Sequence, residues 1–143
     1  MHHIRSAEFI DLQRILEFLK INGLPTVGVE SCYANFVIAT DEKGTLLGVA
    51  GLEIYSQMAL LRSVAVEKNS RRKGHGRALV EAVLGNAKRS GVHTIYLLTE
   101  TASDYFKHLG FDLVDRKDID EVVMASLEFT ECRNTALVMR KTI

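Results

Sequence analysis

The chain has 143 residues, a formal net charge of zero, 47% apolar residues and 25% charged residues. This length and balance fit one ordinary globular domain, so residues 1–143 are expected to form a single unit. The neutral charge argues against a nucleic-acid binder or a protein of anionic membrane surfaces, since both need an excess of basic residues.

The first half of the chain predicts a strand, a helix and a meander of three strands. Residues 4–5 form the first strand, and Ser6 is expected to cap a helix that ends near Asn22-Gly23. Residues 36–39, 45–55 and 58–66 have the pattern of strands. In the second of these, alternation predicts two sets, each on its own face: Leu46, Ala50, Leu52 and Ile54, and Leu47, Val49, Glu53 and Tyr55.

After residue 66 the apolar period changes from two to nearly four, which predicts a long helix ended by Gly91. Leu79, Val83 and Ala87 form its apolar stripe. Residues 94–98, 111–114 and 135–139 are predicted strands, and residues 102–109 and 119–125 are predicted helices. This order predicts an α+β fold whose central sheet is mixed, mostly antiparallel and flanked by helices.

The segment before the long helix carries a dense set of cationic residues and glycines. Arg71, Arg72, Lys73 and Arg77 lie within seven residues, around Gly74 and Gly76. The first turn of a helix has unpaired amides and a partial positive charge, and glycine lets an anion come close to the backbone. The pattern predicts a phosphate or diphosphate site. Alternatively, the glycines only shape a tight start to the helix.

Two common phosphate-binding patterns do not fit this segment. The chain lacks the Gly-Lys-Ser/Thr of a Walker loop. A dinucleotide fingerprint needs a third glycine where Leu79 stands, and a parallel strand–helix–strand unit in place of the meander. Nucleoside triphosphates and NAD are therefore not expected as ligands.

Two signatures resemble the GNAT superfamily of acetyltransferases. Arg-x-x-Gly-x-Gly after the strand Val64-Ala65-Val66 resembles the family's acyl-CoA loop, and the stretch from residue 99 to the Leu-Gly-Phe at residues 109–111 resembles its second signature. The resemblance implies the GNAT fold, in which two central strands splay into a V-shaped slot. It implies acetyl-CoA as the cofactor. The residues implied to hold it are Val64, Ala65, Val66, Arg71, Arg72, Lys73, Gly74, His75, Gly76, Arg77, Thr99 and Phe106.

The resemblance also implies the reaction, which is direct attack by the primary amine of a small, amino-acid-like acceptor, without a metal. Residues 23–25, 51–55, 59–64 and 96–99 are similar to the small arsenic-resistance N-acetyltransferases, so an organoarsenical toxin is one implied acceptor. Family members often pair, and a homodimer through the C-terminal strand is a further implied partnership. Two other functions stay open: a non-catalytic acyl-CoA-binding or sensing module, and N-acetylation of a peptide or protein.

The family's usual acid and base are absent from their positions. Leu60 and Leu61 stand where many relatives have a glutamate base, so Glu53 on the neighbouring strand is the candidate base. Its alternative is a half-buried, paired carboxylate. Phe106 replaces the tyrosine that protonates the thiolate in many relatives, and adjacent Tyr105 points about 100° away on a helix. Water or the substrate is therefore expected to supply that proton.

Two further polar residues have two readings each. Arg62 is a candidate anchor for a carboxylate or phosphonate of the acceptor, because guanidinium matches such anions, or it forms an ion pair with Glu53. Thr99 contacts the pantetheine arm or caps the end of its strand. Cys32 and Cys132 lack zinc-ligand spacing, so no metal is expected. The chain shows no signal-peptide or membrane-spanning pattern, which predicts a cytoplasmic location.

Overall fold

The computed structural model describes residues 3–125 and 136–143, so Cys132 and the first residue of the predicted last strand, Thr135, lie outside the described residues. Seven described strands form one sheet in the order β1-β2-β3-β4-β5-β7-β6. The strands are β1 (His3–Ser6), β2 (Val37–Thr40), β3 (Leu46–Tyr55), β4 (Met58–Val66), β5 (Thr94–Thr99), β6 (Asp112–Val114) and β7 (Leu137–Thr142). The α-helices are α1 (Leu12–Ile21), α2 (Val29–Cys32), α3 (His75–Arg89), α4 (Ser103–His108) and α5 (Glu121–Met124).

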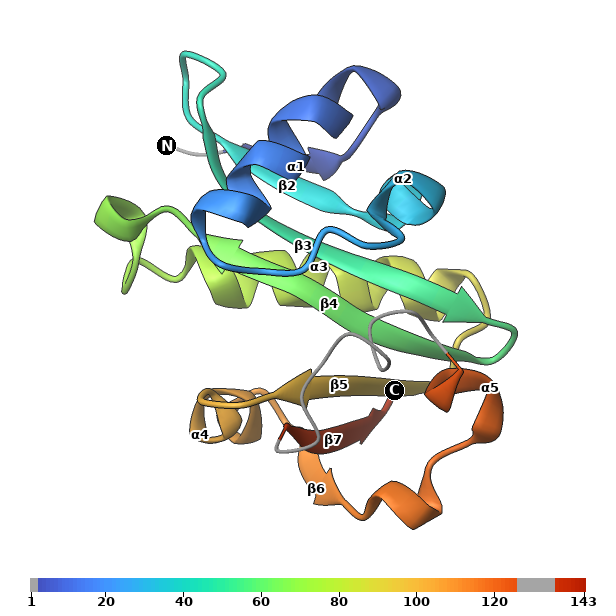
Figure 1. Ribbon diagram of the computed structural model, residues 1–143. Coiled ribbons are helices and arrows are strands. Elements are labelled where there is room, and N and C mark those ends of the chain that lie inside the picture. The colour runs from blue at the N-terminus through green and yellow to red at the C-terminus, as the bar shows by residue number, and fades with distance from the viewer. Residues whose placement is uncertain (1–2, 126–135) are drawn as a thin grey trace.

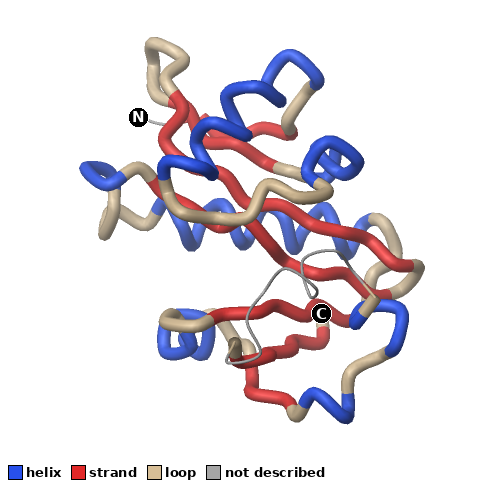
Figure 2. The backbone as a smooth tube through the Cα atoms, viewed as in Figure 1, coloured by secondary structure: helices blue, strands red, loops and turns tan. Residues whose placement is uncertain are grey.

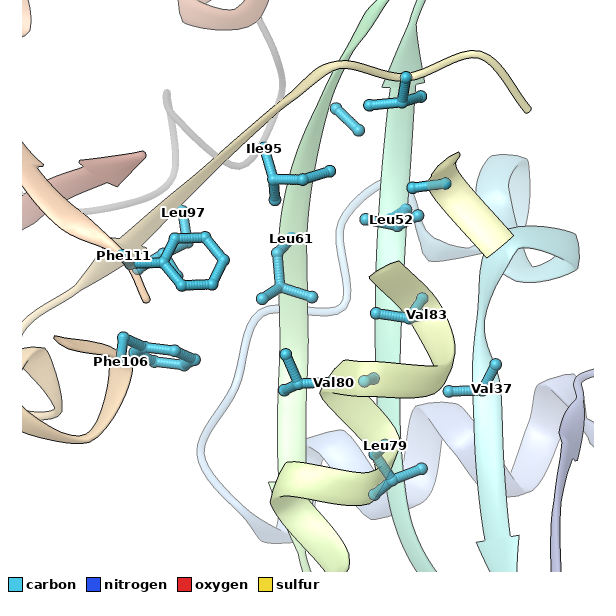
Figure 3. Packing of buried hydrophobic residues seen from close by; sticks show 14 of the residues in the cluster. Val37, Leu52, Leu61, Leu79, Val80, Val83, Ile95, Leu97, Phe106 and Phe111 are labelled. Atoms are coloured by element: carbon cyan, nitrogen blue, oxygen red, sulfur yellow. The ribbon is translucent and has the colours of Figure 1, made fainter. Parts of the chain in front are cut away.

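Helices cover both faces of this sheet (Figure 1). On one face, Leu79, Val80 and Val83 of α3 pack in the cluster that contains Leu52 and Leu61 of the central strands (Figure 3). These α3 residues recur every three to four positions, which places them on one stripe of the helix. On the other face, Ile15 and Leu19 of α1 belong to a second cluster with Ile38 and Val49. The predicted α+β architecture with a mixed, mostly antiparallel sheet is confirmed.

The sheet opens between its two central strands. β4 and β5 run parallel and pair only from Met58↔Thr94 to Leu61↔Leu97, whereas every other neighbouring pair is antiparallel. Beyond Leu61 and Leu97 both strands continue without pairing to each other. Figure 1 shows them diverging toward the side where α3 begins and α4 lies. The V-shaped slot that the sequence implied is therefore present.

The first helix begins later than the sequence predicted. Ser6 belongs to β1 and pairs with Val37, so it does not cap the helix. A 3-10 turn at residues 9–11 comes first, and a capping box starts it: the Asp11 carboxylate accepts the amide of Glu8 (2.8 Å) and also forms ion pairs with Arg5 (2.8 Å) and Arg14 (3.0 Å). The buried acid thus fixes the entry to the helix in place of a serine cap. These contacts hold the pKa of Asp11 well below its usual range, chiefly through the hydrogen bond from Arg5.

A bulge corrects the predicted faces of β3. Thr40 pairs with Leu46 and Ala39 with Gly48, so Leu47 is an extra residue. An extra residue exchanges the faces of the residues before it. Leu47 therefore packs with the α3 cluster and Leu46 with the α1 cluster, the reverse of the alternation expected for these two.

The second half of the chain differs at its ends from the prediction. Residues 116–118 form a 3-10 turn, and α5 begins only after Asp120, whose carboxylate accepts the amide of Val122 (2.9 Å). β7 runs on to Thr142 because it pairs along its whole length with β5. β6 covers the other edge of β7 from Val138 to Arg140, so this part of the strand is not open to a second copy.

Candidate functional site

A bulge in β4 shapes one wall of the slot. Val49 pairs with Ala65 but Gly51 pairs with Arg62, so Ser63 and Val64 together oppose one residue of β3. Ser63 adopts a left-handed conformation (φ 61°), which non-glycine residues rarely do. The bulge turns Val64 and Val66 toward the α3 cluster, while Ala65 faces the α1 cluster. Because β5 has already diverged, the backbone of residues 62–66 pairs with none of the described strands on that side.

A cavity of about 560 Å³ occupies the slot. It passes from one face of the sheet to the other, because its walls come from both sides: the loop after α1, the central strands, α4 and the residue before β7. The lining residues are Gly23, Leu24, Pro25, Leu61, Arg62, Ser63, Val64, Leu97, Leu98, Thr99, Glu100, Thr101, Ala102, Phe106 and Ala136. Figure 2 shows the loop between α1 and α2 running across the strands. The cavity therefore extends from the splayed ends of the central strands to the residues of that loop.

The start of α3 lies at the same end of the slot (Figure 1). Gly74 precedes the helix with φ 83°, and no neighbouring atom would lie within 4 Å of a Cβ there. The first helical hydrogen bond is from Ala78 to the carbonyl of Gly74 (3.1 Å), so the amides of Gly76 and Arg77 precede the first intrahelical donor. These amides and the positive end of the helix axis favour an anion.

The basic side chains of this loop differ in their contacts. Arg71 is partly fixed, because it donates to the carbonyl of Val66 (3.0 Å) and to the side chain of Asn22 (3.2 Å). Arg72 and Lys73 are exposed, and Arg77 pairs with Glu81 (3.0 Å) on the outer face of the helix. His75 is buried at the first position of α3. The loop therefore presents backbone donors flanked by exposed cationic side chains.

Arg62 and Glu53 form a buried ion pair beside the cavity. Arg62 Nη1 lies 2.7 Å from Glu53 Oε2, and the side chains are 0% and 12% exposed. The hydroxyl of Tyr55 donates to the other oxygen of Glu53. The guanidinium also donates to the carbonyls of Val27 (2.7 Å) and Pro25 (3.2 Å), which ties the loop between α1 and α2 to β4. Arg62 and Glu53 thus form the ion pair that was one of the two alternatives from the sequence. Glu53 is not among the residues that line the cavity.

The residues at the end of β5 and in α4 occupy the opposite wall. The hydroxyl of Thr99 accepts the amide of Ala102 (3.0 Å), the strand-end cap that was one of its two readings. Phe106 is buried, lines the cavity and packs against Phe111 with ring centroids 5.9 Å apart. Tyr105 instead lies outside the cavity walls, against Gly76 of α3. Burial raises the pKa of Tyr105, and Arg77 opposes that rise.

Sequence reasoning missed two features of this site. The left-handed Ser63 carries no sequence signal, since serine is not typical of that conformation. The wall formed by residues 23–25 comes from a loop far away in the chain, which only the resemblance of those residues pointed to. Among residues 3–125 and 136–143, no three His, Cys, Asp or Glu side chains are grouped to hold a metal. No helix in the same part of the chain combines the length and apolar character needed to cross a bilayer.

Comparison with known proteins identifies the family of this chain. Residues 32–113 match the model of the acetyltransferase (GNAT) domain. An uncharacterised N-acetyltransferase of Chlorobaculum tepidum is 32% identical over 101 residues, which cover 70% of this chain and 61% of the relative. An amino-acid acetyltransferase of Pasteurella multocida is 30% identical over 83 residues, 57% of this chain and 19% of the relative. The chain thus spans less than two thirds of the length of these relatives.

A solved structure shows the same fold. N-acetylglutamate synthase from Neisseria gonorrhoeae, complexed with coenzyme A and N-acetyl-glutamate, superposes with a TM-score of 0.85. Its sequence is 19% identical, and the match covers 99% of this chain and 35% of that one. The predicted GNAT fold is confirmed. The chain belongs to the GNAT acetyltransferase family.

Proposed function

We propose that this protein transfers an acetyl group from acetyl-CoA to the primary amine of a small, amino-acid-like acceptor, and that residues 1–143 act as one catalytic domain. The observation that carries the proposal is the slot between β4 and β5, which has along one wall a strand edge that no described strand pairs with, and at its mouth the amide-rich start of α3. A strand edge suits the amides of a pantetheine arm, and a helix start suits a diphosphate. Acetyl-CoA carries both groups and supplies an activated thioester.

The residues of this chain fit that cofactor in three places. The backbone of Val64, Ala65 and Val66 pairs with the pantetheine amides, while residues 71–77 hold the diphosphate. Phe106 packs beside the arm, and Thr99, at the end of β5, contacts it. The bulge at Ser63 supports the reaction itself, because backbone donors turned out of a ladder are available to stabilise negative charge on the thioester oxygen.

The acceptor enters from the part of the cavity that lies beside the loop between α1 and α2. Arg62 is among the residues that line the cavity, but its side chain is 0% exposed and paired with Glu53, so an acceptor carboxylate reaches the guanidinium only by displacing one of its partners. Relatives named amino-acid acetyltransferase, and the N-acetyl-glutamate in the Neisseria complex, support an amino acid as the acceptor. An amino acid whose side chain carries arsenic or phosphorus is a narrower candidate, in keeping with the arsenic-resistance resemblance.

We assign Glu53 two competing roles that one variant separates. Glu53→Gln removes a proton acceptor but keeps the shape of the side chain. If Glu53 is the base, kcat falls by about 10²- to 10⁴-fold and the acidic limb of the pH profile disappears. If Glu53 serves only to hold Arg62, the KM for the acceptor rises while the pH profile keeps its shape. Since both carboxylate oxygens accept hydrogen bonds, we favour the second role.

The function is tested by mixing the protein with acetyl-CoA and a panel of amino acids, including arsenic and phosphorus analogues, and following release of free thiol. Turnover with one amino acid supports the proposal. Binding of coenzyme A without turnover of any amine would instead identify an acyl-CoA-binding module, and turnover of peptides alone a protein acetyltransferase. The paired variant Arg71→Ala, Arg72→Ala should weaken coenzyme A binding, whereas Arg89→Ala at the far end of α3 should not. Light scattering of the same protein measures its molar mass and tests the homodimer that the family resemblance implies.

A further inference from the structure

The two aromatic residues in the middle of α4, Tyr105 and Phe106, point to different places. Phe106 points into the core beside Leu97 and Phe111 (Figure 3). Tyr105 packs edge-on against Phe106, with ring centroids 5.2 Å apart, and remains 41% exposed. Its hydroxyl lies so near Gly76 that a Cβ on that glycine would be only 2.6 Å from the oxygen. The phenol therefore stands at the start of α3 and not in the cavity beside Phe106.

The surroundings of that hydroxyl are those of an anion site. Gly76 is the second residue of α3, where amides precede the first helical hydrogen bond. Arg77 lies close enough to Tyr105 to influence its charge state. Because burial raises the pKa of Tyr105, the phenol keeps its proton at neutral pH and is a donor. A neutral hydroxyl among cationic groups gives a bound phosphate one more hydrogen bond without adding charge.

We propose that the Tyr105 hydroxyl donates a hydrogen bond to the diphosphate bound at the start of α3, so that Tyr105 is a cofactor-binding residue and not the acid that protonates the departing thiolate. This inference rests on the proposed function. Gly76 then has a second purpose: it keeps clear the space that the phenol oxygen occupies. The thiol end of the slot receives Phe106 in its place, a side chain with no proton to give.

The first test compares two acetyl donors with Tyr105→Phe. Acetyl-CoA carries the diphosphate, and S-acetylpantetheine has no phosphate. The variant should bind coenzyme A about tenfold more weakly by calorimetry, the loss expected for one hydrogen bond to a charged group. Its kcat/KM with S-acetylpantetheine should equal that of the wild type. Tyr33→Phe, on a tyrosine that contacts Phe9 on the opposite side of the sheet, is the matched control and should change neither quantity.

Two results would overturn the inference. If kcat falls equally with both donors and the basic limb of the pH profile moves, Tyr105 is the acid. If Tyr105→Phe binds coenzyme A as the wild type does, the hydroxyl only fills space. Failure of the wild type itself to bind coenzyme A is a different outcome, because it would refute the proposed function without any comparison of variants.

A second test uses the contact with Gly76. Gly76→Ala should have a lower melting temperature relative to its parent in the wild-type background than in the Tyr105→Phe background, because only in the wild-type background does the new methyl group meet the phenol oxygen. In the Tyr105→Phe background the nearest ring atom, Cζ, lies 3.6 Å from that methyl, which is an ordinary contact. Equal changes in melting temperature in both backgrounds would show that the hydroxyl is not where the inference needs it. If Gly76→Ala does not fold, recovery of folding in the double variant gives the same answer.

Discussion

Exchanging Arg62 for methionine removes a cation whose side chain is fully buried and leaves the carboxylate of Glu53, only 12% exposed, without its partner. It also takes a donor from each of the carbonyls of Pro25 and Val27. Breaking a buried ion pair from one side costs about 3–5 kcal/mol, so the free energy of unfolding should fall by that amount. Glu53→Gln should cost a similar amount, because it leaves the buried guanidinium uncompensated.

The double variant should lose much less than the two single losses together. With both charges gone, no buried ion lacks a partner, and the coupling free energy should be about 2 kcal/mol or more. Urea denaturation at neutral pH measures all three free energies. The exposed pair Arg77 and Glu81, with side chains 66% and 63% exposed, supplies the control cycle, whose coupling should be about 0.3–0.5 kcal/mol. A coupling for Arg62 and Glu53 no larger than the control would refute the argument from burial.

Three further perturbations follow from the same contacts. Gly51→Ala should destabilise the fold by about 1–3 kcal/mol in urea denaturation, because the new Cβ would overlap the fully buried ring of Phe36. Asp11→Asn should cost about 1.5–3 kcal/mol at pH 7, the range for hydrogen bonds to a charged group, because the arginine partners left behind are partly exposed. Since the pKa of Asp11 is lowered on folding, its contribution is complete above its unfolded pKa of about 3.9 and declines below it, so the variant and wild-type stabilities should converge as the pH falls toward 2. Gly74→Ala should cost about 1 kcal/mol through backbone strain alone and should weaken coenzyme A binding, whereas Gly44→Ala, at the same φ of 83°, should cost as much and leave binding unchanged.

The sequence predicted the parts of this fold that local pattern controls. The strand boundaries at Met58 and Val66 and the apolar stripe of α3 follow directly from periods of two and nearly four. The loop at residues 71–76 was identified because glycines and arginines cluster within it. Each of these features depends on residues that are near neighbours in the chain.

Features that depend on distant residues escaped prediction. The start of α1 is fixed by Arg5 as well as by Asp11, and a search for a serine or threonine cap misses that ion pair. The exchanged faces of Leu46 and Leu47 come from a bulge that pairing with β2 creates. The placement of Tyr105 was half foreseen: helix geometry separates it from Phe106, but only the folded chain shows that Gly76 is what it meets. Tertiary packing decided each of these outcomes.

The narrow junction between β4 and β5 has a consequence for how the molecule holds together. Among the described residues, β1–β4 and β5–β7 are joined through the backbone by the four pairs from Met58↔Thr94 to Leu61↔Leu97 and by the adjoining hydrogen bonds from His93 and Thr94 to the carbonyl of Gln57. A ligand that lies along residues 62–66 would add contacts between the two parts of the sheet, β1–β4 (the larger subsheet) and β5–β7 (the smaller subsheet). Occupancy should therefore slow amide hydrogen exchange throughout β5, β7 and β6, well beyond the residues that the ligand touches, because the smaller subsheet would lose its freedom to open on its own.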